Sequence, residues 1–193
     1  MSMEEELQVG ELTVRIEQDD QPDSPREWDN FGRMLCCHGR YNLGDKHKMS
    51  AEELREYVKN DDEVVLAIPL WLYDHSGLSM RASSSNGFND QWDSGQVGWI
   101  VATEATVKKE FGKVDVKTLA KARKLLVSEV EVFDQYLQGD VWYYGVSDEK
   151  GEVLDSCGGM YGLEYCREEA TSAAKRLWAE IQEREQDLAY RAD

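Results

Sequence analysis

Residues 64–73, VVLAIPLWLY, form a nearly continuous apolar run rich in β-branched and aromatic side chains. A run of this length with a proline inside it favours a buried β-strand, interrupted at Pro69, over a helix. Residues 96–103, QVGWIVAT, have the same character and are the expected partner strand. The polar segment between the two runs is then a loop, with one short strand expected at residues 78–82.

Toward the N-terminus, Leu12, Val14 and Ile16 alternate with polar residues, a pattern typical of a half-buried strand. Residues 18–25 contain two of the three prolines of the chain, which predicts a loop. Ser50 and Glu53 have the spacing of a capping box, so a short helix is expected to begin there.

The C-terminal half predicts two long helices separated by a hairpin. Residues 115–138 carry an apolar stripe at steps of three and four, formed by Leu119, Ala122, Leu126, Val130, Phe133 and Leu137. Residues 142–146 and 152–157 flank a turn at 148–151, which predicts a β-hairpin. A last helix is expected at residues 164–187, with an inward face formed by Cys166, Ala170, Ala173, Leu177 and Ile181.

This order of elements predicts the α+β class, because strands and helices do not alternate regularly. We expect one acidic domain over residues 1–193, with a mostly antiparallel sheet, two long helices and one short helix. Residues 1–10 have no assigned element and are interpreted as a candidate disordered arm.

The charge of the chain is strongly negative. Its 22 Lys and Arg against 39 Asp and Glu give −17, with −8 in residues 1–30, +5 in residues 105–125 and −10 in residues 126–193. Proteins that bind the nucleic-acid backbone need positive surface, so no direct binding of duplex DNA is expected.

The N-terminus lacks a secretory signal and no run of 18 apolar residues exists, so we expect no membrane span and a cytoplasmic location.

The cysteines and glycines do not form a recognisable cofactor motif. The cysteines lack the C-x₂-C spacing of zinc sites, so we expect free thiols and no metal, with a zinc site as the alternative; they are Cys36, Cys37, Cys157 and Cys166. Gly158, Gly159 and Gly162 lack the spacing of a phosphate-binding loop and predict a turn with positive φ before the last helix.

The loop between the two apolar runs is a candidate catalytic site. Asp74 and Asp93 are suited to hold Mg²⁺ or Mn²⁺, and His75 is suited to move a proton, which together predict a metal-assisted hydrolase. Ser76 and Ser94 are not in a G-x-S-x-G motif. The alternative interpretation is structural, because Asp, Ser and Gly are common turn residues.

The acidic surface is a candidate binding site. Ordered carboxylates imitate the phosphates of a duplex, which carries one charge per about 1.7 Å of helix axis. Such a surface attracts the basic cleft of a host nuclease, repressor or defence component. The exposed carboxylates expected on the last helix are Glu164, Glu168, Glu180, Glu183 and Asp187, and Trp28 and Trp178 are the expected aromatic anchors.

A basic stripe on the first long helix is formed by Lys117, Lys121 and Lys124. It is a solvated face, a contact with an acidic segment of a second copy in a homodimer, or a site for a nucleotide signal. The last interpretation would make the protein a small-molecule sponge.

Several motifs resemble those of a family of small uncharacterised proteins from phages, plasmids and archaeal viruses. The motifs are PREWDNFG (25–32), YDHSG (73–77), WDSGQVG (92–98) and DQYLQGD (134–140). The serine-rich SSSNGFND before WDSGQVG differs from the shorter loop expected there. The resemblance implies no activity and no catalytic residue. It implies that the protein is an accessory protein of a mobile element. Such proteins often act on host defence or regulation. Together with the charge, it favours an inhibitor of a host nucleic-acid-handling protein.

Overall fold

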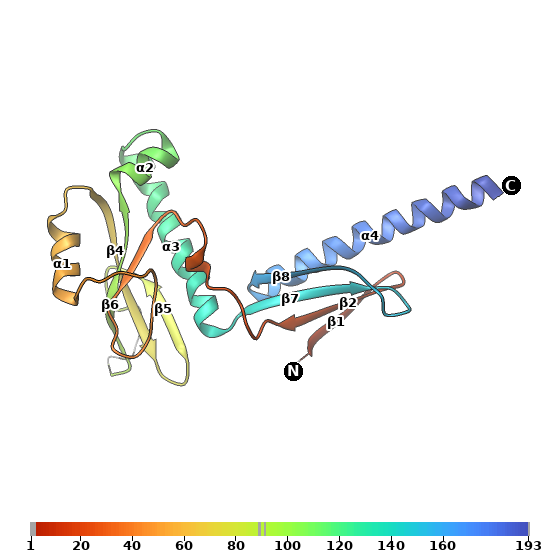
Figure 1. Ribbon diagram of the computed structural model, residues 1–193, viewed down its shortest axis with the longest axis horizontal. Helices are drawn as coiled ribbons and strands as arrows, with labels where there is room; N and C mark the ends of the chain where they lie inside the picture. Colours follow the sequence, from red (N-terminus) through yellow and green to blue (C-terminus); the bar gives the residue numbers. More distant parts are fainter. Residues whose placement is uncertain (1–2, 89, 91, 193) are drawn as a thin grey trace. The chain divides into compact units, whose positions relative to one another are not determined.

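The computed structural model describes residues 3–88, 90 and 92–192. Within them lie two four-stranded antiparallel sheets and four α-helices, so the chain has the predicted α+β fold with one helix more than expected (Figure 1). The sequence analysis expects one domain, whereas the contacts within the chain divide it into two compact units. We call them the terminal unit, Met1–Asp23 with Gly139–Asp193, and the central unit, Ser24–Gln138.

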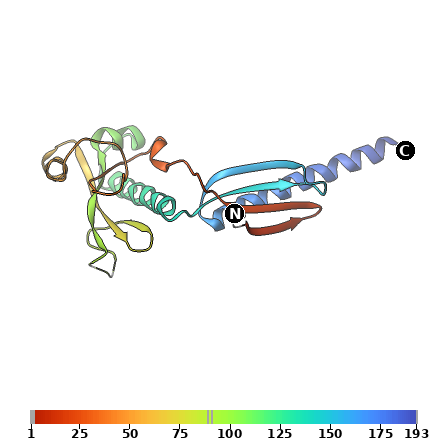
Figure 2. The same cartoon turned by 60° about the horizontal axis from the view of Figure 1, so that its bottom comes forward.

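The terminal unit is a sheet with one long helix on one face. Its strands have the order β1-β2-β7-β8 (Figure 2). Small side chains at Ala170 and Ala173 let the helix approach the sheet closely, where it packs on Val14, Ile16 and Val146. The predicted strand, hairpin and last helix are therefore confirmed; the elements are β1 (Met3–Val9), β2 (Leu12–Gln18), β7 (Val141–Ser147), β8 (Val153–Tyr161) and α4 (Leu163–Ala192).

Residues 3–9 are a strand, so the expectation of a disordered arm is wrong for them; residues 1–2 lie outside the described part. β1 pairs with β2 from Met3↔Glu17 to Val9↔Leu12. Leu7 and Val9 pack against the core of the terminal unit. Gly10 closes the hairpin with φ +62°, a conformation that favours glycine. Glu5 and Glu6 of this strand are therefore held in a sheet.

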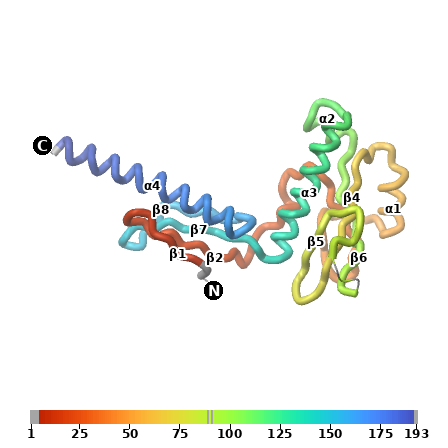
Figure 3. Tube along the Cα trace, turned by 180° about the vertical axis from the view of Figure 1, so that it is seen from behind, coloured from red at the N-terminus to blue at the C-terminus, as the bar shows by residue number. Residues whose placement is uncertain are grey.

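The central unit has a sheet of order β3-β6-β4-β5. Helix α3 covers one face, where Leu126 and Val130 pack with Ile68 and Ile100 (Figure 3). Helix α1 places Leu54 in a second cluster with Leu35 and Val101 of β3 and β6. The elements are β3 (Arg33–Cys36), α1 (Ala51–Asn60), β4 (Val64–Asp74), β5 (Leu78–Ala82), β6 (Ser94–Thr103), α2 (Glu104–Phe111) and α3 (Val116–Gln138).

The strands and helices predicted for this unit are confirmed, including the capping box of Ser50 and Glu53. The interruption expected at Pro69 is a shift of register at the next two residues, Leu70 and Trp71. Strand β3 and helix α2 were not predicted. Helix α2 has a single buried residue, Val107, so it lacks the apolar periodicity that identifies a helix.

A buried ion cluster joins three distant segments of the central unit. Arg26, in a 3₁₀ turn (Pro25–Glu27), donates two hydrogen bonds of 2.9 Å to Asp45 and one of 3.0 Å to Glu129 of α3. Its side chain is only 4% exposed. Burial alone would lower the pKa of Arg26, but the bonds and attraction to both carboxylates outweigh burial and raise it.

Candidate functional site

Most of the negative charge belongs to the terminal unit. Its residues include 21 acidic and 7 basic side chains, a net charge of −14, whereas the central unit has 18 and 15, a net charge of −3. The ion pairs in the terminal unit use few of these carboxylates. Arg167 bonds to Glu5 at 2.7 Å and also to Glu164, and Arg15 bonds to Glu6 at 3.1 Å. Many of the other described carboxylates of this unit are exposed.

Helix α4 extends this acidic surface beyond the sheet (Figure 1). Its packing against the sheet ends at Ile181, and residues 182–191 are all exposed. The five carboxylates predicted on this helix are exposed as expected: Glu164, Glu168, Glu180, Glu183 and Asp187. Within the described residues, the last three have no ion-pair partner. They lie three and four residues apart, and so form one stripe.

The predicted aromatic anchors do not belong to this surface. Trp178 packs against the core of the terminal unit, and its ring lies so close to Gly10 that a Cβ there would fall 2.2 Å from it. Trp178 is half-buried, so the expectation that it is an exposed aromatic does not hold, and its role as an anchor stays a prediction. Trp28 is 52% exposed but belongs to the central unit. Leu188 and Tyr190, which the sequence analysis did not single out, are 67% and 85% exposed at the end of α4.

The candidate catalytic residues of the 73–98 loop do lie together. The ring nitrogen Nδ1 of His75 is 2.9 Å from a carboxylate oxygen of Asp93. The backbone N–H of Asp74 donates to the carbonyl of Asp93 at 2.8 Å. A carboxylate at Nδ1 holds the imidazole with a proton on that nitrogen, which leaves Nε2 as the basic one. The pair has the arrangement of a general base with its orienting carboxylate.

Three neighbouring residues that were not predicted complete this site. Asp74 accepts hydrogen bonds from Tyr41 at 3.1 Å and Arg40 at 3.3 Å. His38 stacks on Tyr41, and its Nδ1 accepts backbone N–H bonds from Arg40 and Tyr41. Its proton is therefore on Nε2, the opposite tautomer to that of His75. The segment HGRY gave no signal in the sequence, because its partner Asp74 lies more than thirty residues away.

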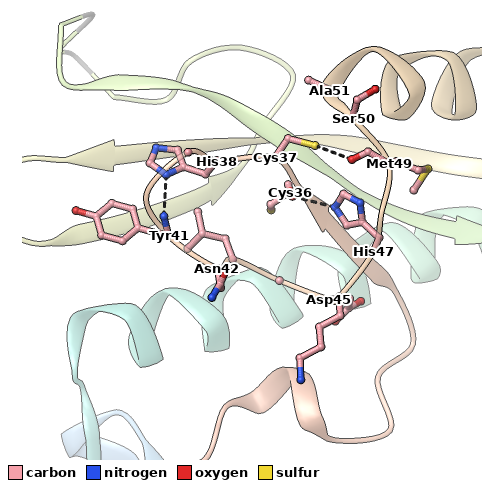
Figure 4. Close-up of a pocket in the computed structure, with 14 residues that line it drawn as sticks. Cys36, Cys37, His38, Tyr41, Asn42, Asp45, His47, Met49, Ser50 and Ala51 are labelled. Carbon is pink, nitrogen blue, oxygen red and sulfur yellow. Dashed lines mark hydrogen bonds between the residues drawn. The ribbon is translucent and has the colours of Figure 1, made fainter.

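Two adjoining cavities border these residues. One, of about 500 Å³, is lined by His38, Arg40, Asp74 and Asp93. The other, of about 650 Å³, shares His38 with the first and is lined by His47 (Figure 4). His47 Nε2 bonds to the carbonyl of Cys36, and its buried Nδ1 has no hydrogen-bond partner within the described residues.

The carboxylates of the loop each have a partner in the structure. Asp74 and Asp93 bond to separate cationic or polar partners, and the described residues contain no group of three or more His, Cys, Asp or Glu placed to hold a metal. The cysteines are free. Burial raises the pKa of the Cys36 thiol to about 12 and that of Cys166 to about 11. Cys166 is buried, Cys36 and Cys37 are half-buried, and Cys157 is exposed.

The basic stripe lies on the exposed face of α3, as predicted. Near the start of this helix, Lys113 forms an ion pair with Asp115 at 2.7 Å. That bond and the backbone N–H of Thr118 lower the pKa of Asp115 to about 2. Lys117, Lys121 and Lys124 have no ion-pair partner within the described residues.

No family model, curated protein or solved structure matches this chain. The resemblance in its motifs therefore stays a prediction. Among the described helices, none has the length and apolar character needed to cross a membrane.

Proposed function

We propose that this protein binds and inhibits a host nucleic-acid-handling or defence protein by placing carboxylates in a basic cleft. The observation that carries the proposal is the concentration of charge, with −14 of the −17 in the terminal unit. The carboxylates of β2 and α4 are held on regular elements, so their spacing is fixed. Fixed charges attract a basic cleft without the entropy cost of ordering a flexible arm.

The setting suggested by the motifs is consistent with this function, because inhibitors of host proteins are useful to phages and plasmids. The division of the chain into two units is also consistent with this function. The central unit supplies a separate stable fold, and the terminal unit supplies the charged surface.

Competition with DNA is the test of this function. The immobilised protein should retain a host protein at low salt, and added duplex DNA should release it, because both occupy the same cleft. Raising the salt concentration should also release the host protein over a narrow concentration range, because salt screens the attraction. A neutral polymer such as dextran is the control. Retention unaffected by an excess of DNA would contradict the proposal.

A hydrolase is the second candidate, and the 2.9 Å contact between His75 and Asp93 favours it. His75 is the acid or base in this candidate. Arg40 lines the same cavity as Asp93, the carboxylate partner of His75, and is placed to stabilise negative charge there. Whether Asp74 and Asp93 also hold Mg²⁺ or Mn²⁺ stays a prediction, since each carboxylate already has a partner.

Asp93→Asn tests the second candidate. The change removes the charge that orients His75, so turnover of a phosphodiester or ester substrate should fall about a hundredfold or more. The melting temperature should stay nearly constant, because the pair is substantially exposed. Parallel assays with Mg²⁺, with Mn²⁺ and with EDTA decide the metal dependence. A large loss of stability instead would support the structural interpretation of the loop.

A further inference from the structure

We infer that the free end of α4, residues 182–191, enters a groove of the partner as a helix, with Tyr190 as the apolar anchor. The inference rests on the proposed function and replaces Trp28 and Trp178 as the anchors. The partner it fits is a protein whose groove has basic walls and an apolar floor.

The free end is an unsupported helix. Residues 182–191 make three turns beyond the last residue that packs on the sheet, and all ten are exposed. Helices of this length are marginal in water unless something packs on them. Large apolar side chains there, with Leu188 at 67% and Tyr190 at 85% exposure, add surface that a partner can bury.

The side chains of this end lie on two different faces of the helix. Tyr190 follows Glu183 by seven residues and Asp187 by three, so it stands at the end of the acidic stripe. Leu188 follows Ile181 by seven residues and continues the face that packs on the sheet, about 160° around the helix from Tyr190. Tyr190 and the carboxylates are therefore presented together on one face, as in helices that bind in grooves.

The negative charge of the terminal unit determines which kind of partner can bind the free end of α4. A second copy would bring another unit of −14 against this surface. A coiled coil between two copies would also place Arg184 and Arg191 at the buried positions that continue from Ile181 and Leu188. The carboxylates of the stripe have no ion-pair partner within the described residues. A groove with Lys or Arg on its walls supplies those partners.

The experiment measures the dissociation constant for the host protein that duplex DNA displaces, at low and at high salt. Tyr190→Ala should weaken binding about tenfold at both salt concentrations, because the lost contact is apolar. Leu188→Ala, on the other face of the helix, should change the affinity less. Tyr165→Ala is the matched control. It removes a 54% exposed tyrosine of the same helix, about 37 Å away by helix rise, and should leave affinity unchanged. Circular dichroism checks that each variant is folded.

Several outcomes would overturn the inference. If Tyr190→Ala binds as tightly as the unmodified protein while charge reversal on the stripe weakens binding, the proposed function stands and the helix insertion fails. If Trp28→Ala alone weakens binding, the anchor belongs to the central unit. If no host protein is displaced by DNA, both the inference and the proposed function fail.

Discussion

Replacing Arg26 with methionine is expected to lower the free energy of unfolding of the central unit by about 3–5 kcal/mol. The change removes one partner of a buried cluster and leaves the carboxylates of Asp45 and Glu129 without their cation. These carboxylates also accept backbone N–H bonds from Met34 and Phe31, so the loss would loosen β3 and the segment before it. Denaturant unfolding followed by tryptophan fluorescence measures the effect.

Arg15→Met is the matched control for this prediction. Arg15 also bonds to a glutamate, Glu6, but both side chains are substantially exposed. Exposed ion pairs contribute about 0–1 kcal/mol, so this variant should unfold close to the unmodified protein. Equal stability of the Arg26 and Arg15 variants would show that the buried cluster does not hold the central unit together.

Changing Glu180, Glu183 and Asp187 together to lysine is expected to weaken binding of the host protein about ten- to a hundredfold at low salt. Each reversal replaces an attraction with a repulsion, and exposed charges of this kind contribute up to about 1 kcal/mol each. The difference should shrink at high salt because the charges are screened. The fold should be retained, because all three side chains are exposed.

The control for this variant has the same change in net charge. Glu56, Asp62 and Glu63 are exposed carboxylates of the central unit, and their replacement by lysine also adds six charge units. If both triple variants lose affinity equally, binding follows net charge alone and the stripe on α4 is not a site.

The sequence predicted the elements whose stabilising pattern is local. The stripes of α3 and α4 and the alternation of β2 repeat within the element itself, so periodicity is enough to find them. Strand β1 was missed because acidic residues dominate it, and pairing with β2 is what stabilises it. The Arg26 cluster was also invisible, since its partners Asp45 and Glu129 lie 19 and 103 residues away along the chain.

The candidate sites show the same limit. Asp74, His75 and Asp93 were predicted because they flank two strong strand signals, and the pairing of those strands brings them together. Arg40 and Tyr41 reach this site from another loop. The partial burial of Trp178 was not predicted because its neighbour Gly10 lies at a turn far away in the sequence. Division into two units had no local signal either, because the terminal unit combines both ends of the chain.

The most direct test of whether the acidic surface occupies a basic cleft compares two immobilised proteins in one host lysate. One is the unmodified chain, and the other carries lysine at Glu180, Glu183 and Asp187. We expect the unmodified chain to retain a nucleic-acid-handling protein that elutes in a narrow salt window, and the variant to release it at markedly lower salt. The same protein eluting from both at the same salt would contradict the account.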